Sequence, residues 1–234
     1  MSKQEKIVNM FDSIAHKYDL VNRILTFGID KKWREKAVKN SLKHINIDSL
    51  IVLDVACGTG DMIEVWIKES LKNNINITVS GLDASKQMLK IAKKRFPDIN
   101  FYKAYATDIP LNDSTIDIIS ISFGIRNVID IKKAILEFRR ILKENGILLI
   151  LEFVNNENPN NLRKLIDLYS NKLLPKIGGL ISNNKEAYEY LPFSIKNFYT
   201  TQELINLFNT FDFKLMEYNH FNFGQVGCFI FKNK

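Results

Sequence analysis

The stretch that decides the fold is LIVLDVACGTGD, residues 50–61. Residues 50–56 form a short apolar run typical of a buried strand, and Gly58 and Gly60 come soon after it. Two glycines spaced i and i+2 let the backbone turn sharply and approach a ligand closely. Residues 59–73 have helical character, and the start of a helix offers unpaired N–H groups. The stretch therefore predicts a strand, a tight turn and a helix around a ligand-binding edge.

The same alternation of short apolar runs and helical segments continues after the turn. We expect four more buried strands, at residues 75–82, 100–105, 116–122 and 146–153, with helices between them. Strands that alternate with helices in this way indicate an α/β fold with a parallel, doubly wound sheet. A helix at 201–210 precedes FKLMEYNHF and VGCFIFK, which read as a terminal antiparallel pair of strands.

The remaining segments complete a single domain of 234 residues. Residues 1–48 read as an N-terminal helical cap and residues 49–154 as the core that carries the ligand-binding edge. Residues 155–200 break the rhythm with an Asn/Pro-rich start and a pair of glycines, so we expect an inserted helical lobe there. Residues 201–234 supply the last helix and the antiparallel strands.

Composition favours an ordinary globular protein. Hydrophobic residues make up 46% of the chain and charged residues 25%, which excludes a disordered tail, a collagen-like chain and a disulfide scaffold. The longest wholly apolar run, residues 147–151, is far shorter than the ~20 residues that cross a bilayer. The first residues lack the apolar core of a secretory signal. Two cysteines without a CxxC spacing and three scattered histidines predict reduced thiols and no metal site. We therefore expect a soluble, cytoplasmic protein.

The chain is basic, with a formal net charge of +7. Such a balance suits a solubilising surface, an anionic membrane or a nucleic acid. A nucleic-acid binder would need a clustered basic stripe with exposed aromatic residues, and here the basic residues are dispersed. The charge pattern therefore predicts no nucleic-acid partner.

Two carboxylates and one missing glycine narrow the choice of ligand. Asp83 ends the second strand, where a carboxylate can bind the two ribose hydroxyls of a nucleotide-like cofactor. A dinucleotide fingerprint would need a third glycine where Ile63 stands, and no GKS or GKT makes a phosphate loop. Asp61 would repel a pyrophosphate and would suit a cationic ligand. The pattern favours S-adenosylmethionine, a nucleoside with a sulfonium and no phosphate, over an ordinary strand–helix turn with a surface aspartate.

Two further strand ends complete the predicted site. Tyr105, Ala106 and then Thr107-Asp108 come at the end of the third strand, where a backbone amide with an acidic neighbour could bind adenine. A polar turn before Pro110 is the alternative. The fourth strand ends in SFGIRN, at the edge of the sheet where ligands bind in such folds.

Together these motifs resemble the ubiquinone/menaquinone biosynthesis C-methyltransferase family over essentially the whole chain. The motifs that carry the resemblance are YDLVN (18–22) with FGI (27–29) and Trp33, VLDVACGTGD (52–61), SFGIRNV (122–128), RILKENGILLILEF (140–153), and YEYLPFSI (188–195) with Phe198. The resemblance implies a class I S-adenosylmethionine-dependent methyltransferase fold, Rossmann-like, with a seven-stranded doubly wound sheet. It also implies methyl transfer to a ring carbon of a prenylated hydroquinone: demethylmenaquinol, a polyprenyl-methoxy-benzoquinol, or both.

The resemblance implies roles for single residues as well. The residues that it and the glycine turn assign to the cofactor are Asp54, Gly58, Thr59, Gly60, Asp83, Tyr105, Ala106 and Ser122. Tyr18, Arg126 and Asn127 are implied at the reaction centre, with Arg126 acting through a water that accepts the phenolic proton. Asp19 is an alternative base, or else a helix cap or a surface carboxylate.

The chain departs from the family at a few positions. Those departures are Val21, Thr26, Asp30 and Cys57, where the family usually has Met, Ser, His and Gly. Asp30 directly precedes a helical run, so we expect it to cap a helix at 31–40. The alternative is that Lys31, Lys32 or Arg34 neutralises its charge.

The implied substrate carries a tail that is insoluble in water, which predicts peripheral contact with the inner membrane. The N-terminal helices could dock there, as could the lobe at 155–195 through Leu173, Leu174, Ile177 and Leu180, unless these residues bury against the sheet. Tyr188 and Tyr190 line the mouth of a prenyl channel or pack in the core. The sequence leaves open whether the chain forms a homodimer. Two other functions stay open: methyl transfer to another small molecule, and nucleic-acid binding on the same fold.

Overall fold

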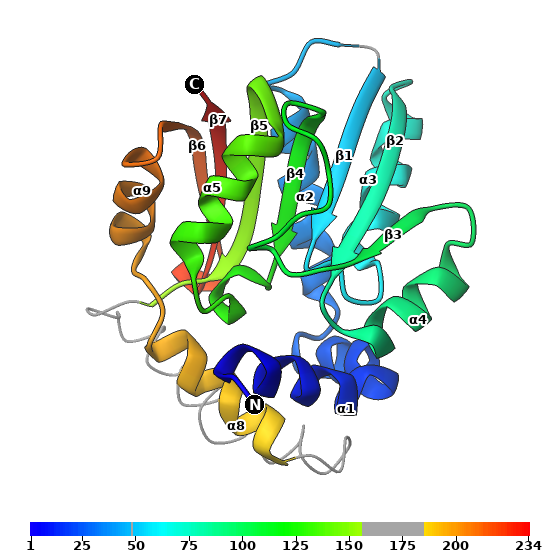
Figure 1. Cartoon of the computed structure of the whole chain (residues 1–234), viewed down its shortest axis with the longest axis vertical. Helices are drawn as coiled ribbons and strands as arrows, with labels where there is room; N and C mark the ends of the chain where they lie inside the picture. Colours follow the sequence, from blue (N-terminus) through cyan, green and yellow to red (C-terminus); the bar gives the residue numbers. More distant parts are fainter. Residues whose placement is uncertain (48, 156–184) are drawn as a thin grey trace.

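The computed structural model describes residues 1–47, 49–155 and 185–234, which form one seven-stranded sheet of order β3-β2-β1-β4-β5-β7-β6 (Figure 1). The strands are β1 (Ser49–Val55), β2 (Asn76–Asp83), β3 (Asn100–Lys103), β4 (Ile116–Ser122), β5 (Leu142–Phe153), β6 (Phe213–Phe221) and β7 (Val226–Asn233). The first five in chain order are parallel, and β7 is antiparallel to both β5 and β6. The predicted α/β class, with its doubly wound sheet and terminal antiparallel pair, is confirmed.

The largest difference from the expected strands is the start of β5, which the sequence pattern placed at residue 146. Leu142 already pairs with Ile116, and the register shifts between Ile116 and Ile118 before regular pairing resumes at Ile147. Asn145 has a φ of 62°, in the left-handed region, so the irregular part of β5 coincides with the glycine-containing segment. The strand therefore begins four residues earlier than the sequence pattern predicts, through an irregular first part.

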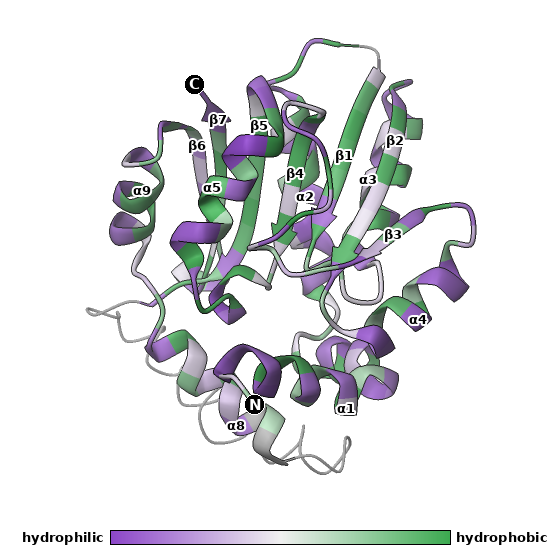
Figure 2. Cartoon of the chain, viewed as in Figure 1, coloured by the Kyte–Doolittle hydropathy of each residue, from purple (hydrophilic) through white to green (hydrophobic). Residues whose placement is uncertain are grey.

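Helices cover both faces of the sheet. They are α2 (Ile29–Leu42), α3 (Asp61–Lys72), α4 (Lys86–Arg95), α5 (Ile131–Ile141) and α9 (Thr201–Asn209), with short 3-10 turns η1 (Ile125–Asn127) and η3 (Asn222–Gly224). Because strand side chains alternate between faces, Leu53 and Ile119 lie in the core with α5 and α9, whereas Val52 and Ile118 lie in the core with α2 and α3. Figure 2 shows apolar strands between helices that are largely hydrophilic outside.

Helices α1 (Lys3–Leu25) and α8 (Lys185–Lys196) lie across the carboxyl edge of the parallel strands (Figure 1). They share a small apolar cluster made of Ile14, Val21, Leu25 and Ala187. Of the predicted lobe, residues 156–184 lie outside the described residues, and so do Leu173, Leu174, Ile177, Leu180 and the side chain of Tyr188. Within the described segments, none of the helices has both the length and the hydropathy needed to span a bilayer.

Candidate functional site

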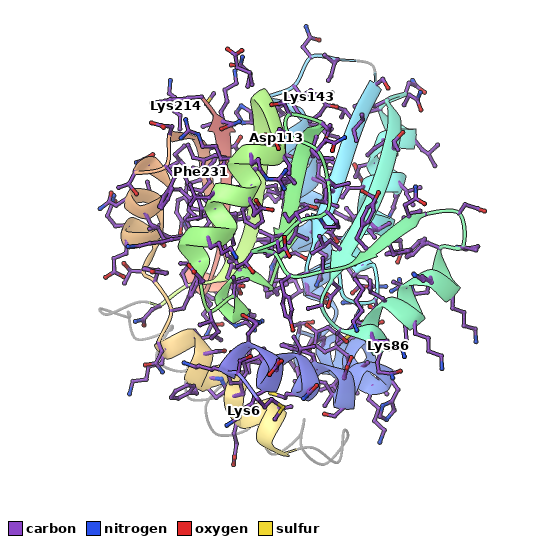
Figure 3. All side chains as sticks on the ribbon, in the orientation of Figure 1. Lys6, Lys86, Asp113, Lys143, Lys214 and Phe231 are labelled. Atoms are coloured by element: carbon purple, nitrogen blue, oxygen red, sulfur yellow. The ribbon has the colours of Figure 1, made fainter. Side chains whose placement is uncertain are left out.

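The carboxyl ends of β1, β2 and β4 border a cavity that α1 covers, and we call it the first cavity. Side chains extend into this region from the strand ends and from α1 (Figure 3). On the sheet side its lining includes Gly58, Thr59, Asp61, Asp83, Tyr105, Ala106, Ser122 and Asn127, and on the helix side Gln4, Ile7, Val8, Phe11, Tyr18 and Arg34. Six of the eight predicted cofactor residues therefore share one cavity, while Asp54 and Gly60 do not line it.

The glycine turn has the geometry that its sequence predicts. Gly58 and Gly60 have φ angles of 55° and 93°, in the left-handed region that favours glycine. A Cβ on Gly60 would lie 2.7 Å from the Phe96 ring, whereas a Cβ on Gly58 would project into open space. Because Gly58 lines the first cavity, a side chain there would occupy room that a ligand needs. Gly60 is also the residue before α3, and no side chain caps this helix start.

Asp83 is held by the backbone around it. Its Oδ2 accepts a hydrogen bond from the Gly58 N–H at 2.8 Å, and its Oδ1 accepts one from the Ser85 N–H at 2.8 Å. Burial raises the pKa of Asp83 to about 6, and the backbone hydrogen bonds oppose that rise. Each carboxylate oxygen can accept a second hydrogen bond. The carboxylate is thus fixed in orientation and still has capacity for two hydroxyl donors.

Asp54 lies behind the turn rather than on the cavity wall. It is 1% exposed, and its Oδ1 accepts a hydrogen bond from the Ser120 hydroxyl at 2.7 Å. The Trp66 Nε1–H donates to the same hydroxyl at 2.9 Å. Its Oδ2 has no hydrogen-bond partner among the described residues. Burial raises the pKa of Asp54 to about 7.

The first cavity suits a nucleoside that carries a cationic tail. Asp83 and Asp61 place two carboxyl groups on its wall, and the Oδ1 atom of Asn127 is buried without a partner in the described part of the chain. Burial alone would raise the pKa of Asp61, but Arg34 and Arg23 outweigh burial and hold it below its usual range. Carboxylates, an amide oxygen and a glycine cradle are the groups that ribose hydroxyls and an ammonium group would need. The residues present therefore fit S-adenosylmethionine, and their role as its ligands stays a prediction.

A second cavity adjoins the first and is mostly apolar. It is lined by Met10, Phe11, Ile14, Tyr18, Asn22, Leu25, Thr26, Asp30, Trp33, Arg34, Phe123, Arg126, Phe153, Ala187, Tyr190 and Leu191. Phe11, Tyr18, Arg34 and Phe123 line both cavities and form what we call the shared wall. The ring of Phe123 lies 5.1 Å from that of Phe153, measured between centroids. Tyr190 lies in this lining, and its place at the mouth of a prenyl channel stays a prediction.

Arg126 enters the second cavity from η1 and is paired with a buried carboxylate that sequence reasoning missed. Its Nη1 forms an ion pair with Glu152 of β5, a residue that is 0% exposed, and its Nε donates to the Ser194 hydroxyl at 3.2 Å. Burial raises the pKa of Glu152, and the charge of Arg126 opposes that rise. The available signal was the lone acid in the apolar run ILLILEF, since a buried carboxylate needs a cationic partner.

The other two predicted reaction-centre residues lie at different walls. Tyr18 lines both cavities, and burial raises the pKa of its phenol despite the hydrogen bond with Asn22. Asn127 lines only the first cavity, and its backbone oxygen accepts a hydrogen bond from Gln4 Nε2 at 3.1 Å. The structure therefore brings Tyr18 and Arg126 together at the second cavity, with Asn127 next to them in η1 but facing the first.

The predicted helix cap at position 30 is wrong. Helix α2 begins at Ile29, after Gly28 in the left-handed region, so Asp30 lies within its first turn. The carboxylate is 2% exposed and pairs with Arg23 of α1 and with Arg34, the latter at 2.5 Å. The alternative, neutralisation by a neighbouring cation, is correct for Arg34, and Arg23 is a partner that the sequence did not suggest.

Asp19 is neither a helix cap nor an isolated surface carboxylate. It lies within α1, and its Oδ1 accepts a hydrogen bond from the Thr59 hydroxyl at 2.7 Å. Burial raises its pKa, and the Thr59 hydrogen bond opposes the rise. Asp19 lines neither cavity, so its evident contribution is to fasten α1 to the glycine turn.

Comparisons with known proteins agree with this geometry. The chain matches the model of the ubiE/COQ5 methyltransferase family over residues 1–232. It is 46% identical to the ubiquinone/menaquinone biosynthesis C-methyltransferase UbiE of Campylobacter jejuni, with 99% of both chains covered. It is 36% identical to the demethylmenaquinone methyltransferase of Thermotoga maritima, covering 95% of this chain and 94% of that protein.

A likeness to a solved structure shows the fold in addition. A SAM-dependent methyltransferase from Thermotoga maritima superposes with a TM-score of 0.63 at 20% identity, covering 97% of this chain and 100% of that one. The predicted class I methyltransferase fold is thus confirmed, and so is the family resemblance, because the family model spans nearly the whole chain. The chain belongs to the ubiE/COQ5 methyltransferase family.

Proposed function

We propose that this protein transfers the methyl group of S-adenosylmethionine to a ring carbon of a prenylated hydroquinone in menaquinone or ubiquinone biosynthesis. The observation that carries the proposal is the shared wall, where a cavity built around the glycine turn meets an apolar cavity that contains Arg126. The relatives from Campylobacter jejuni and Thermotoga maritima are named as enzymes of this reaction class, which supports the proposal. Donor and acceptor would meet across Tyr18 and Phe123.

The first cavity would hold the methyl donor, which when bound supplies an electrophilic methyl group on a sulfonium. Asp83 would accept hydrogen bonds from the ribose hydroxyls, because both its oxygens are oriented by backbone N–H groups. The turn at Gly58 would lie beneath the methionine tail, and Asp61 would balance its ammonium group. Tyr105 and Ala106 would border the adenine.

The acceptor ring must become a nucleophile before it can attack. A phenol titrates near pH 10, so the site has to stabilise the phenolate or remove its proton as the methyl group moves. Arg126 is always charged and cannot act as a base, but its guanidinium, fixed against Glu152 and Ser194, can orient a water that accepts the proton. Tyr18 keeps its own proton, because burial raises its pKa, and can donate to a ring oxygen. Overall the ring carbon exchanges a proton for the methyl group.

The second cavity would take the ring and the first part of the prenyl tail. Its lining by Phe123, Phe153 and Trp33 offers flat apolar surfaces, and Met10, Ile14 and Leu25 continue the apolar surface along α1. Near the same end of α1, Leu20, Ile24 and Phe27 are 56%, 42% and 87% exposed. These exposed side chains would make the peripheral membrane contact that a prenylated substrate requires.

Deletion of the gene in its host tests the proposal, with the quinone pool read by mass spectrometry. The strain should accumulate a quinone that lacks one methyl group, and the wild-type gene should restore the methylated form. A gene carrying Asp83→Ala should not restore it. An unchanged quinone pool in the deletion strain would exclude the proposed reaction.

A further inference from the structure

Arg34 has an unusual position for a buried cation, because it lies in the shared wall and not in a surface ion pair. Its side chain is 8% exposed, and its Nη1 donates to the Asp30 carboxylate at 2.5 Å and to the Asp30 carbonyl oxygen at 3.3 Å. Its Nε is buried and has no hydrogen-bond partner among the described residues. A buried donor without a partner is costly. The free Nε–H, in a residue that lines both cavities, indicates an acceptor atom that comes from a ligand.

Arg34 and Arg126 each lie over a different ring of one aromatic pair. The guanidinium carbon of Arg34 lies 5.1 Å from the centre of the Phe123 ring, and that of Arg126 lies 5.5 Å from the centre of the Phe153 ring. The two rings are themselves 5.1 Å apart. A hydroquinone carries its two oxygens on opposite sides of a flat ring. A ring packed on Phe123 and Phe153 would therefore present an oxygen toward each cation.

The two arginines differ in how their charge is balanced. Arg126 is paired with Glu152, which forms no ion pair with another cation among the described residues. Arg34 shares the carboxylate of Asp30 with Arg23, and Arg23 also pairs with Asp61. Asp30 therefore serves two cations, whereas Glu152 serves Arg126.

The titratable and charged groups around Arg34 come from each element packed against it. They are Tyr18 and Arg23 of α1, Asp30 of its own helix α2, Asp54 of β1, Asp61 of α3, and Arg126 of η1 across the second cavity. Arg34 and Arg126 both oppose the burial that raises the pKa of the Tyr18 phenol. The same two charges would act on a substrate phenol that lies beside Tyr18.

We propose that Arg34 is a second catalytic residue of the acceptor site: its guanidinium binds a ring oxygen of the phenolic substrate and stabilises the ionised form, and Asp30 is the residue that positions it. This inference rests on the proposed function for the identity of the substrate. It assigns the two ring oxygens to two different cations, Arg34 and Arg126. The central claim is that Arg34 binds a phenolic oxygen, and this claim can be tested without methyl transfer.

The test uses the full chain loaded with S-adenosylhomocysteine and para-nitrophenol as the probe, because the phenolate of this compound absorbs visible light. Titration with pH gives the pKa of the bound probe in the wild type, Arg34→Gln, Arg34→Lys and Asp30→Asn. Arg139→Gln is the matched control, since Arg139 pairs with Asp212 at 2.9 Å and lines neither cavity. Thermal melting and the affinity for S-adenosylmethionine are measured for every variant.

We expect the wild type and the Arg139→Gln control to lower the pKa of the bound probe. Arg34→Gln should lose this effect, while its affinity for S-adenosylmethionine stays within about threefold of the wild type. Arg34→Lys should keep part of the effect, because it keeps the charge without the planar donor set. Asp30→Asn should lie between the wild type and Arg34→Gln. Methyl transfer to a reduced short-chain demethylmenaquinone should fall about tenfold or more in Arg34→Gln and recover at higher pH, as the phenol ionises without help.

Several results would overturn the assignment. One is an unchanged probe pKa in Arg34→Gln, whatever happens to turnover. Another is a loss of cofactor affinity as large as the loss of turnover, which would make Arg34 a ligand of the cofactor. If Arg34→Gln fails to fold, Arg34→Lys decides, and a wild-type probe pKa in that variant would also count against the proposal. A wild type that shifts the probe through Arg34 but does not methylate the quinol would refute the proposed function and leave the role of Arg34 standing.

Discussion

Asp83 shows how a single side chain can be prepared for a ligand by its surroundings. Both of its oxygens accept backbone hydrogen bonds, from Gly58 and Ser85, and the Gly58 bond ties the carboxylate to the glycine turn. Losing this group would remove the proposed acceptor for two ribose hydroxyls and one support of the turn. The residue is thus expected to matter for cofactor binding more than for the stability of the sheet.

Asp83→Ala should weaken the binding of S-adenosylmethionine by about 2–4 kcal/mol, given ~1.5–3 kcal/mol for one hydrogen bond to a charged group. Isothermal titration measures the effect, with Asp113→Ala as the control. Asp113 is an exposed carboxylate that lines neither cavity and lies far from α1 in Figure 3. An affinity within threefold of the wild type in Asp83→Ala would remove this residue from the site.

Asp54 should make the protein less stable as the pH rises from about 4 to about 7, the opposite of the usual effect of a carboxylate. Burial raises its pKa from 3.8 to about 7, so the folded chain binds this proton more tightly than the unfolded chain does. The contribution is fully present below about pH 4 and is lost as the pH rises to about 7. In the wild type this proton should change the free energy of unfolding by an amount on the order of 2–4 kcal/mol across that interval, and Asp54→Asn should remove the change. Denaturant unfolding at several pH values measures it, and parallel curves for the variant and the wild type would refute this expectation.

Arg126 should be intolerant of even a conservative change. Its guanidinium contacts Glu152, Ser194 and the carbonyl oxygen of Phe123 at once, and a lysine ammonium cannot reproduce that planar set. Arg126→Lys should lower methyl transfer by about tenfold to a hundredfold, with cofactor affinity unchanged. Turnover and isothermal titration are compared on the same preparation. A matching loss of cofactor binding would mean that Arg126 acts through the fold and not on the acceptor.

At the scale of elements, α1 covers the first cavity and forms polar contacts with the strand ends and with the helices that follow them. Its Asp12 accepts hydrogen bonds from the Ser85 hydroxyl and from the Gln87 N–H, the latter at 3.0 Å. Asp19 fastens it to Thr59, and Gln4 to the segment after β4. Since its apolar cluster is small, we expect these polar contacts to determine how stably α1 covers the first cavity.

Asp12→Ala should therefore loosen α1 while leaving the sheet intact. We expect faster amide hydrogen exchange in α1 and a loss of cofactor affinity of about 1 kcal/mol, roughly fivefold, similar to the loss of a helix cap. Asn9→Ala is the control, because Asn9 is an exposed residue of the same helix that lines neither cavity. Equal rates of amide hydrogen exchange in the two variants would show that the Asp12 contacts do not hold α1 in place.

The strands of this fold could be predicted from the sequence because burial on both faces leaves a strong apolar signal, as in residues 116–122. The start of α2 could not, because Gly28 and Asp30 are both acceptable residues before a helix and the left-handed turn at Gly28 decides between them. The Asp30–Arg23 pair joins two helices, and nothing in the spacing along the chain shows it. The same holds for Arg126 and Glu152: each residue was visible in a motif, but their pairing depends on the register of the sheet.

At the scale of the whole molecule, the proposed reaction depends on two cavities that meet at one wall. The strand ends and their turns border the first cavity under α1, and the second cavity beside it is lined mainly by α1, α2 and α8 together with Arg126 and Phe153. The same arrangement explains why the predicted residues fall into two groups, with Asp83 and its neighbours in one cavity and Arg126 in the other. A methyl group carried in the first cavity would reach a ring in the second across the shared wall of Phe11, Tyr18, Arg34 and Phe123.

The most direct measurement is the position of the transferred methyl group. The purified protein is incubated with S-adenosylmethionine labelled in its methyl group and with a reduced short-chain demethylmenaquinone, and the product is examined by carbon NMR. We expect a labelled methyl group bonded to a ring carbon, and no product with Asp83→Ala under the same conditions. A label on a ring oxygen, or an unlabelled quinol alongside a protein that binds the cofactor, would contradict this expectation.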